Sequence, residues 1–242
     1  HTSLIVLRHV ANAKDVNAVL GYMEQTGKVP EVSPIAPPEV SARDTAELMD
    51  PGDYFNIQVR QNLKQSYRGL FSARAQFYDN FNKFLSYKQA KETAKAGKLL
   101  DENYRLSVEM SEYKQVIFDI LSPLTEQAEK ELLADEPLKD RIMAMRKMSG
   151  PVQSIMNLYS RTHVLEGARI DVKMAELKKE LEAAKKLPAV TGYDEEKKNY
   201  YSFLSSVESF MKDMQKARDK GAYSDADYNA MSEAYEYGLS VI

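Results

Sequence analysis

Apolar residues recur at helical spacing from Gln58 to Leu124, and this pattern constrains the fold of the chain more than any other feature. They follow one another at steps of three and four residues, in two successive stripes. The first stripe contains Leu63, Tyr67, Leu70, Phe71, Phe77, Phe81, Phe84 and Leu85. The second contains Leu99, Leu106, Met110, Tyr113, Ile117, Leu121 and Leu124. Such spacing places each stripe on one face of an α-helix, and that face must be buried.

The same spacing continues along most of the chain, whereas the alternating pattern of β-strands does not occur. Helices are predicted over residues 9–25, 41–49, 53–87, 99–124, 138–159, 170–187, 200–217 and 224–239. Pro123 is expected to kink or restart its helix, and Pro151 to break the next one. Residues 88–98 are polar on every side, which fits either a solvated helical bridge or a turn. The sequence therefore predicts an all-α bundle of about four to six long, amphipathic, antiparallel helices.

Prolines are concentrated near the amino terminus and suggest the organisation of the chain. Of the 9 prolines, Pro30, Pro34, Pro37 and Pro38 lie between residues 28 and 41, a stretch that cannot form a helix. It is expected to be extended, either draped over the core or free as a linker. We predict an N-terminal helix (1–27), a Pro-rich connector (28–52) and a helical bundle (53–242), with residues 1–27 packed on the bundle as one domain. Pro34 and Pro37 also fit a PxxP ligand, but no basic residue lies nearby, so a connector is favoured.

Charge and cysteine content exclude several classes of function. The net charge is −3 and positive residues form no block, so nucleic-acid binding is not expected. The chain has 0 Cys, which excludes disulfides, thiolate metal sites and a Cys nucleophile. The longest apolar run, residues 4–7, is far shorter than the ~20 residues of a membrane-spanning helix. Because the chain starts at His1, we expect that an upstream segment was removed, together with any targeting signal.

A calcium loop is the sharpest chemical pattern in the sequence. Between Asp225 and Glu236, oxygen-bearing side chains fall at positions one, three, five, nine and twelve of the EF-hand template. The glycine required for the sharp turn is missing, and Ala230 stands in its place. The same segment also reads as a helix capped by Ser224, with Tyr228, Met231, Tyr235 and Leu239 on its apolar face. We predict that this helix forms, packs against the Phe203–Phe210 stripe and binds no calcium.

Other catalytic and metal patterns do not exceed chance. His163 and Glu166 lie one helical turn apart, but the chain lacks the Glu-x-x-His motifs that a di-metal site needs. Ser111 with Lys114, and Ser209 with Lys212, match a serine–lysine nucleophile pattern without its companion motifs. We therefore predict no catalytic residues, no metal site and no cofactor.

Tyrosines cluster in the last fifty residues, and two of them do not fit the helical stripes. Tyr is favoured at recognition surfaces because it brings contact area and a hydroxyl at low entropic cost. Core packing accounts for Tyr200, Tyr228 and Tyr235. The candidates for ligand binding are therefore Tyr201 and Tyr237.

Three short segments resemble a known family. These are Lys14–Tyr22 (KDVNAVLGY), Phe84–Lys88 (FLSYK) and Tyr228–Tyr235 (YNAMSEAY). Their order resembles that of the YiiG-like family of bacterial envelope lipoproteins, which carry a helical domain of unknown function. The Pro-rich insert departs from that pattern. The resemblance implies export, attachment through a lipidated Cys upstream of His1, and no catalytic residues to transfer.

These observations favour a non-enzymatic helical envelope protein that binds or scaffolds an unknown protein or small ligand. It would be periplasmic and would meet the membrane only through its lipid anchor. The alternatives are a hydrolase with acid/base carboxylates in a groove between helices, a cytoplasmic adaptor, and a secreted partner-binding protein. An upstream signal ending in a small residue and Cys would support the first reading, whereas a Met directly before His1 would contradict export.

Overall fold

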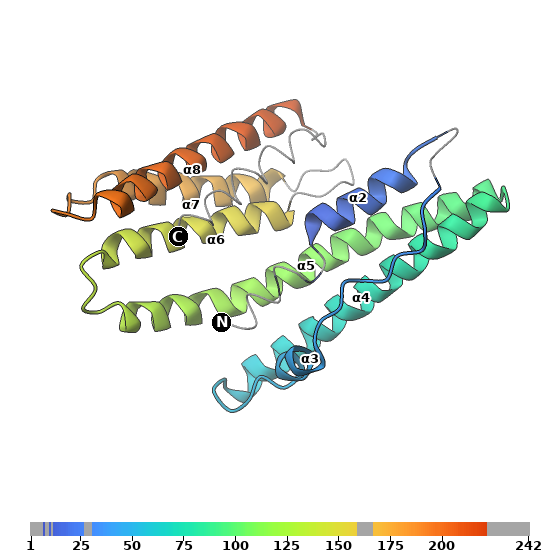
Figure 1. Cartoon of the computed structure of the whole chain (residues 1–242), viewed down its shortest axis with the longest axis horizontal. Helices are drawn as coiled ribbons and strands as arrows, with labels where there is room; N and C mark the ends of the chain where they lie inside the picture. Colours follow the sequence, from blue (N-terminus) through green and yellow to red (C-terminus); the bar gives the residue numbers. More distant parts are fainter. Residues whose placement is uncertain (1–6, 8–9, 11, 27–30, 159–166, 222–242) are drawn as a thin grey trace. The chain divides into compact units, whose positions relative to one another are not determined.

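The computed structural model describes residues 7, 10, 12–26, 31–158 and 167–221, and every regular element in these ranges is an α-helix. In chain order they are α2 (Ala13–Met23), α3 (Ala42–Met49), α4 (Ile57–Gln89), α5 (Thr93–Leu132), α6 (Lys139–Leu158), α7 (Gly167–Lys185) and α8 (Asp194–Lys220) (Figure 1). The five helices from α4 onwards are long, from the 19 residues of α7 to the 40 of α5. The predicted all-α fold is therefore confirmed.

The chain divides into two compact units, residues 1–121 and residues 122–242. This division differs from the expected single bundle over residues 53–242. The boundary falls inside α5, which is continuous from Thr93 to Leu132, so neither a linker nor a change of composition marks it.

In the first unit, α4 and α5 form an antiparallel hairpin. Near the turn Asn80 of α4 meets Asn103 of α5, and farther away Gly69 meets Tyr113. The turn occupies residues 90–92, where Lys91 has a φ of 58° and the Glu92 amide donates to the Tyr87 carbonyl at 2.8 Å. Of the two possibilities for residues 88–98, the turn is therefore correct. The second helix begins at Thr93, earlier than expected.

Aromatic residues fill the core of this hairpin, and the short helix α2 packs on it. Tyr67, Phe77 and Phe81 are among the most completely buried side chains. From α2, Val16, Val19, Leu20 and Met23 are buried, and the Tyr22 ring meets Phe81 edge to face at 5.8 Å. Within the first unit, α2 therefore packs on the hairpin.

The Pro-rich segment lies along α4 as an extended strap. We use this name for residues 31–41, which contain no regular element and end at Ser41, the N-cap of α3. Asn82 hydrogen-bonds Ile35, and Arg74 hydrogen-bonds the Pro38 carbonyl. Of the two arrangements that the prolines allow, the strap is therefore the draped one.

In the second unit, α6, α7 and α8 share an apolar core. Its most deeply buried members include Met148, Ile155, Ile170, Leu177, Phe210 and Met214. The buried Tyr200 hydroxyl donates to the Ala184 carbonyl at 2.6 Å, and the Arg141 guanidinium lies over the Tyr200 ring at 5.0 Å. The last of these helices ends at Gly221, whose φ of 70° places it in the left-handed region.

Two proline interruptions predicted from sequence do not occur. Pro123 lies inside α5 and Pro151 inside α6, and both helices continue past them. The restart at Pro123 and the break at Pro151 were therefore wrong. A proline removes one backbone donor, and tertiary burial of the helix can outweigh that loss. Pro151 is itself buried, which fits this explanation.

Several sequence-based predictions fall outside the described residues. The capped helix from Ser224 to Leu239, the calcium alternative at Asp225 and the candidate Tyr237 belong to residues 222–242. His163 and Glu166 belong to residues 159–166. These predictions stay as they were made.

Candidate functional site

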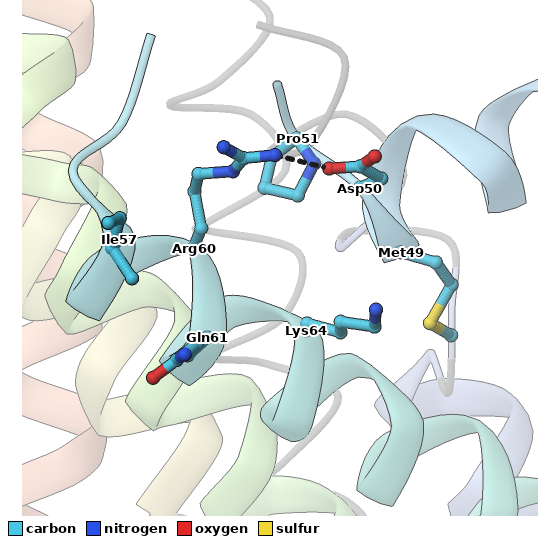
Figure 2. A pocket seen from close by; sticks show the side chains of 7 residues that line it. All are labelled: Met49, Asp50, Pro51, Ile57, Arg60, Gln61 and Lys64. Atoms are coloured by element: carbon cyan, nitrogen blue, oxygen red, sulfur yellow. Dashed lines mark hydrogen bonds and ion pairs between the residues drawn. The ribbon is translucent and has the colours of Figure 1, made fainter. Parts of the chain in front are cut away.

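A pocket of about 190 Å³ lies where α3 ends and α4 begins (Figure 2). It is lined by Met49, Asp50, Pro51, Ile57, Arg60, Gln61 and Lys64. Local sequence explains this arrangement. The last turn of α3 stops at Asp50-Pro51-Gly52, where Gly52 has a φ of 76°. Asn56 then caps α4 by accepting the Val59 amide at 2.9 Å, so that Met49 comes to face the first turns of α4.

Arg60 is the electrostatic centre of the pocket. Its guanidinium donates to Asp50 at 2.9 Å and to Asp53 at 2.8 Å. The hydrogen bond from Arg60 lowers the pKa of the Asp50 carboxyl group, and Lys64 lowers it further. The same pairing raises the pKa of Arg60. Asp50 therefore stays ionised at neutral pH and fixes Arg60 in place.

Lys64 is the cation of the pocket that the neighbouring carboxylates leave available. Asp50 and Asp53 both pair with Arg60, whereas Lys64 takes part in none of the ion pairs between described residues. In Figure 2, Lys64 extends from α4 towards Met49, while Ile57 lies on the other side of Arg60. Ile57 is 72% exposed, so the apolar part of the lining faces solvent. This combination suits a small ligand with an anionic group and an apolar portion.

The sequence did not identify this pocket. Its residues come from a helix end, a turn and a helix start, and no periodic pattern links them. The candidate that the sequence did nominate, Tyr201, lies on α8 in the second unit and is 49% exposed. Its ring contacts Tyr200 edge to face at 5.7 Å. Tyr201 is thus available at the surface, but it does not belong to the pocket.

Lys114 is a buried lysine, and the sequence pattern did not predict its burial. It lies on α5 three residues after Ser111 and is only 8% exposed. Burial lowers its pKa from 10.5 to about 8. The other serine–lysine match, Ser209 and Lys212, is exposed on α8. Helical periodicity gives no signal for Lys114, because a lysine on a buried face looks like an interruption of the stripe.

The described residues contain neither a metal-binding cluster nor a membrane-spanning helix. Among them, no three His, Cys, Asp or Glu side chains gather in a way that could bind a metal ion. Likewise, none of the described helices combines the length and the apolar character needed to cross a bilayer.

The geometry defines an all-α protein of two helical units, and its relatives place it in a family. Residues 1–135 match the family described as Domain of unknown function (DUF6845). Residues 137–240 match the DUF3829-like, C-terminal domain. The chain therefore belongs to the DUF6845 family and continues into a DUF3829-like C-terminal domain. The two matches meet between α5 and α6, whereas the compact units divide within α5.

Solved structures from Bacteroides are similar over nearly the whole chain. An uncharacterized DUF3829-like protein from Bacteroides thetaiotaomicron is 75% identical, with a TM-score of 0.85, covering 100% of this chain and 94% of that one. An alpha helical protein from Bacteroides fragilis is 57% identical, with a TM-score of 0.82, covering 98% and 93%. None of the curated proteins is significantly similar to the chain.

Proposed function

We propose that this chain is a non-enzymatic binding protein of the bacterial cell envelope, and that its pocket takes a small organic anion. The observation that carries the proposal is the composition of the pocket. Lys64 offers a positive charge beside the apolar Met49 and Ile57, while Arg60 is already held by two carboxylates. Such a lining can recognise a ligand without any rearrangement of its charged groups.

Two ion-paired carboxyl groups are unsuited to the role of a general acid. A general acid at neutral pH needs a raised pKa. Asp50 and Asp171, the described carboxyl groups with shifted pKa values, both have the pKa lowered by an arginine partner. A hydrolase with carboxylates in a groove between helices remains the alternative, and a ligand that is consumed rather than bound would favour it.

The size of the pocket limits the ligand. A volume of about 190 Å³ is below the roughly 300–1,000 Å³ of pockets that hold drug-sized molecules. The site therefore suits a compound of a few heavy atoms, or one end of a larger molecule. A short-chain carboxylate such as butyrate has the right chemistry as a probe.

Titration of the ¹⁵N-labelled protein with butyrate tests the pocket. We expect saturable shifts of the Met49, Ile57 and Gln61 amides, because the ligand would lie against these residues. Lys64→Gln should abolish the shifts. Lys83→Gln, a matched change on an exposed part of the same helix, should preserve them. Shifts that do not saturate, or that survive Lys64→Gln, would contradict the assignment.

Envelope attachment is the second part of the proposal, and it rests on the resemblance to YiiG-like lipoproteins. The precursor is expected to carry a signal peptide ending in a small residue and a Cys upstream of His1. Cell fractionation should then find the protein in the membrane fraction, and replacing that Cys by Ser should release it. An initiating Met directly before His1 would overturn this part and favour a cytoplasmic adaptor.

A further inference from the structure

The strap is bound to α4 in the way that a protein binds an extended peptide. The Ile35 amide donates to Asn82 Oδ1 at 2.9 Å, and Asn82 Nδ2 donates to the Ile35 carbonyl at 2.9 Å. One side chain thus satisfies both backbone groups of one residue. Asn82 contacts the backbone of Ile35 and not its side chain. Any extended segment with a free N–H at that position can therefore make the same two hydrogen bonds.

Arg74 holds the strap at a second point. The strap runs antiparallel to α4, because Ile35 meets Asn82 and Pro38 meets the earlier Arg74. Two helical turns separate Asn82 from Arg74, about 12 Å along the axis. Three extended residues span about 10 Å, so the distance from Ile35 to Pro38 along the strap is close to the distance from Asn82 to Arg74 along α4.

The Arg74 guanidinium is buried, and of the two donors Nε and Nη2 on one edge only Nη2 makes a hydrogen bond to a described residue. Arg74 is 6% exposed, and its Nη2 donates to the Pro38 carbonyl. Among the described residues, its buried Nε has no hydrogen-bond partner. Burial consequently lowers the pKa of Arg74. A single neutral carbonyl is a poor partner for a buried guanidinium.

Arg218 shows how the same edge is fully used elsewhere in the chain. Its Nε and Nη2 donate to the two carboxylate oxygens of Asp171 at 2.9 and 2.8 Å. At Arg74 a carbonyl stands where a carboxylate would fit. A chain that ended at the position of Pro38 would present two carboxylate oxygens there, one for each donor.

The strap itself is weakly held. Most of its residues are exposed, and the side-chain hydrogen bonds from Asn82 and Arg74 are its described attachments to the middle of α4. Segments with few buried contacts open locally far more often than the core unfolds. An occupant with a better group for Arg74 can therefore compete for this face.

We propose that the Arg74–Asn82 face of α4 is a docking site for the carboxyl-terminal end of an extended peptide from a partner protein, and that the strap occupies this site until the partner displaces it. Asn82 binds the peptide backbone, and Arg74 binds the terminal carboxylate. The inference rests on the proposed binding function, but it uses a surface separate from the pocket, so each can fail alone.

Peptide binding in solution tests the proposal. The probe is a fluorescein-labelled peptide with the sequence of residues 32–38 and a free carboxyl terminus, followed by fluorescence anisotropy with the full chain. Its C-terminal amide is the matched control. We expect the Kd of the free acid to be at least tenfold lower than that of the amide, because only the acid completes the Arg74 pair. Equal affinity of acid and amide would overturn the proposal.

Variants separate the strap from its site. Ile35→Pro removes the strap amide that Asn82 binds and leaves α4 unchanged, so the free-acid peptide should bind at least threefold tighter. Val32→Pro, elsewhere in the strap, should leave the affinity unchanged.

Asn82→Ala should weaken binding at least tenfold, whereas the pocket variant Lys64→Gln should not. If Ile35→Pro lowers the helical circular dichroism signal, replacement of residues 31–38 by Gly and Ser takes its place. Lack of saturable binding to a helical, strap-weakened protein would refute the docking site, whatever the butyrate titration shows.

Discussion

The two units of this chain bury aromatic and methionine side chains in different proportions. The core of the first unit is aromatic, with Tyr67, Phe77 and Phe81 at its centre, and it encloses the amide pair Asn80–Asn103. The core of the second unit is rich in methionine. Its buried methionines are Met143, Met145, Met148, Met156 and Met214.

This difference affects how many side-chain arrangements each core can accept. Aromatic rings and buried amides accept few geometries, because ring edges and hydrogen bonds are directional. Methionine is flexible and fills irregular space. The first unit should therefore tolerate few core changes, whereas the second should adapt to many. The first unit also carries the pocket and the strap, whose geometry needs a fixed α4.

The largest expected effect comes from the aromatic core. Phe77→Ala should lower the free energy of unfolding of the first unit by about 3–5 kcal/mol, because the site cannot collapse around the lost ring. Met148→Leu in the second unit should cost less than about 1.5 kcal/mol. Urea unfolding with hydrogen exchange resolved along the chain measures both. Similar costs for the two changes would remove the distinction between the cores.

The buried Lys114 should be destabilising at neutral pH. Its pKa is about 8 in the folded chain, against an ordinary 10.5. Below pH 8 both states carry the charge, so the folded state bears the net cost of burying it. Between pH 8 and 10.5 the unfolded chain binds the extra proton, so the stability contribution of this group rises with pH. Lys114→Met should therefore stabilise the protein at pH 7 by up to about 3 kcal/mol.

Urea titrations from pH 6 to 10.5 test this expectation. The gain from Lys114→Met should shrink through the upper part of that range. Lys212→Met, a matched change at an exposed lysine of α8, should show no such trend. A gain that is independent of pH would mean that packing, and not the charge, sets the cost.

Close approach of α4 and α5 depends on Gly69. A Cβ atom at this position would overlap the Tyr113 ring, so Gly69→Ala should cost about 1–3 kcal/mol. Gly97, exposed on α5, has nothing within 4 Å of an added Cβ. Gly97→Ala should therefore stabilise by up to about 1 kcal/mol through helix propensity. Thermal unfolding of the two variants should move in opposite directions, and a shared direction would contradict the close packing.

The smallest effect is expected at the surface pair of the second unit. Arg218 lowers the pKa of Asp171, so their interaction stabilises the fold above the ordinary carboxyl pKa and is lost as the pH falls through the lowered value. Because the pair is solvent-exposed, Asp171→Asn should lower the melting temperature only slightly at pH 7. A large decrease at pH 7 would show that this pair, and not the methionine core, fixes the second unit.

Sequence periodicity predicted the helices well because burial imposes it. The Phe77–Phe81 stripe became the core of α4, and Gly221 ended α8 as expected. The proline rules did worse: the restart at Pro123 and the break at Pro151 do not occur, because local proline preferences are outweighed by packing that only the assembled fold provides.

The candidate sites could not be predicted from the sequence. Arg60 and Asp50 meet because a turn reverses the chain, and Arg74 meets Pro38 across 36 positions of sequence. Neither pairing leaves a periodic signal. The prolines did indicate an extended segment, but they could not show that Asn82 and Arg74 would hold it.

A double-mutant cycle at Asn80 and Asn103 tests most directly whether specific polar contacts fix the first unit. The Asn80 amide donates to Asn103 Oδ1 at 3.1 Å, and Asn103 in turn donates to the Phe77 carbonyl at 3.1 Å. Asn80→Leu and Asn103→Leu should each cost about 1–3 kcal/mol in urea unfolding, because each strands a buried partner. The double variant should cost at least about 1 kcal/mol less than the sum. Additive costs, within about 0.5 kcal/mol, would show that the amides act independently and would contradict the account.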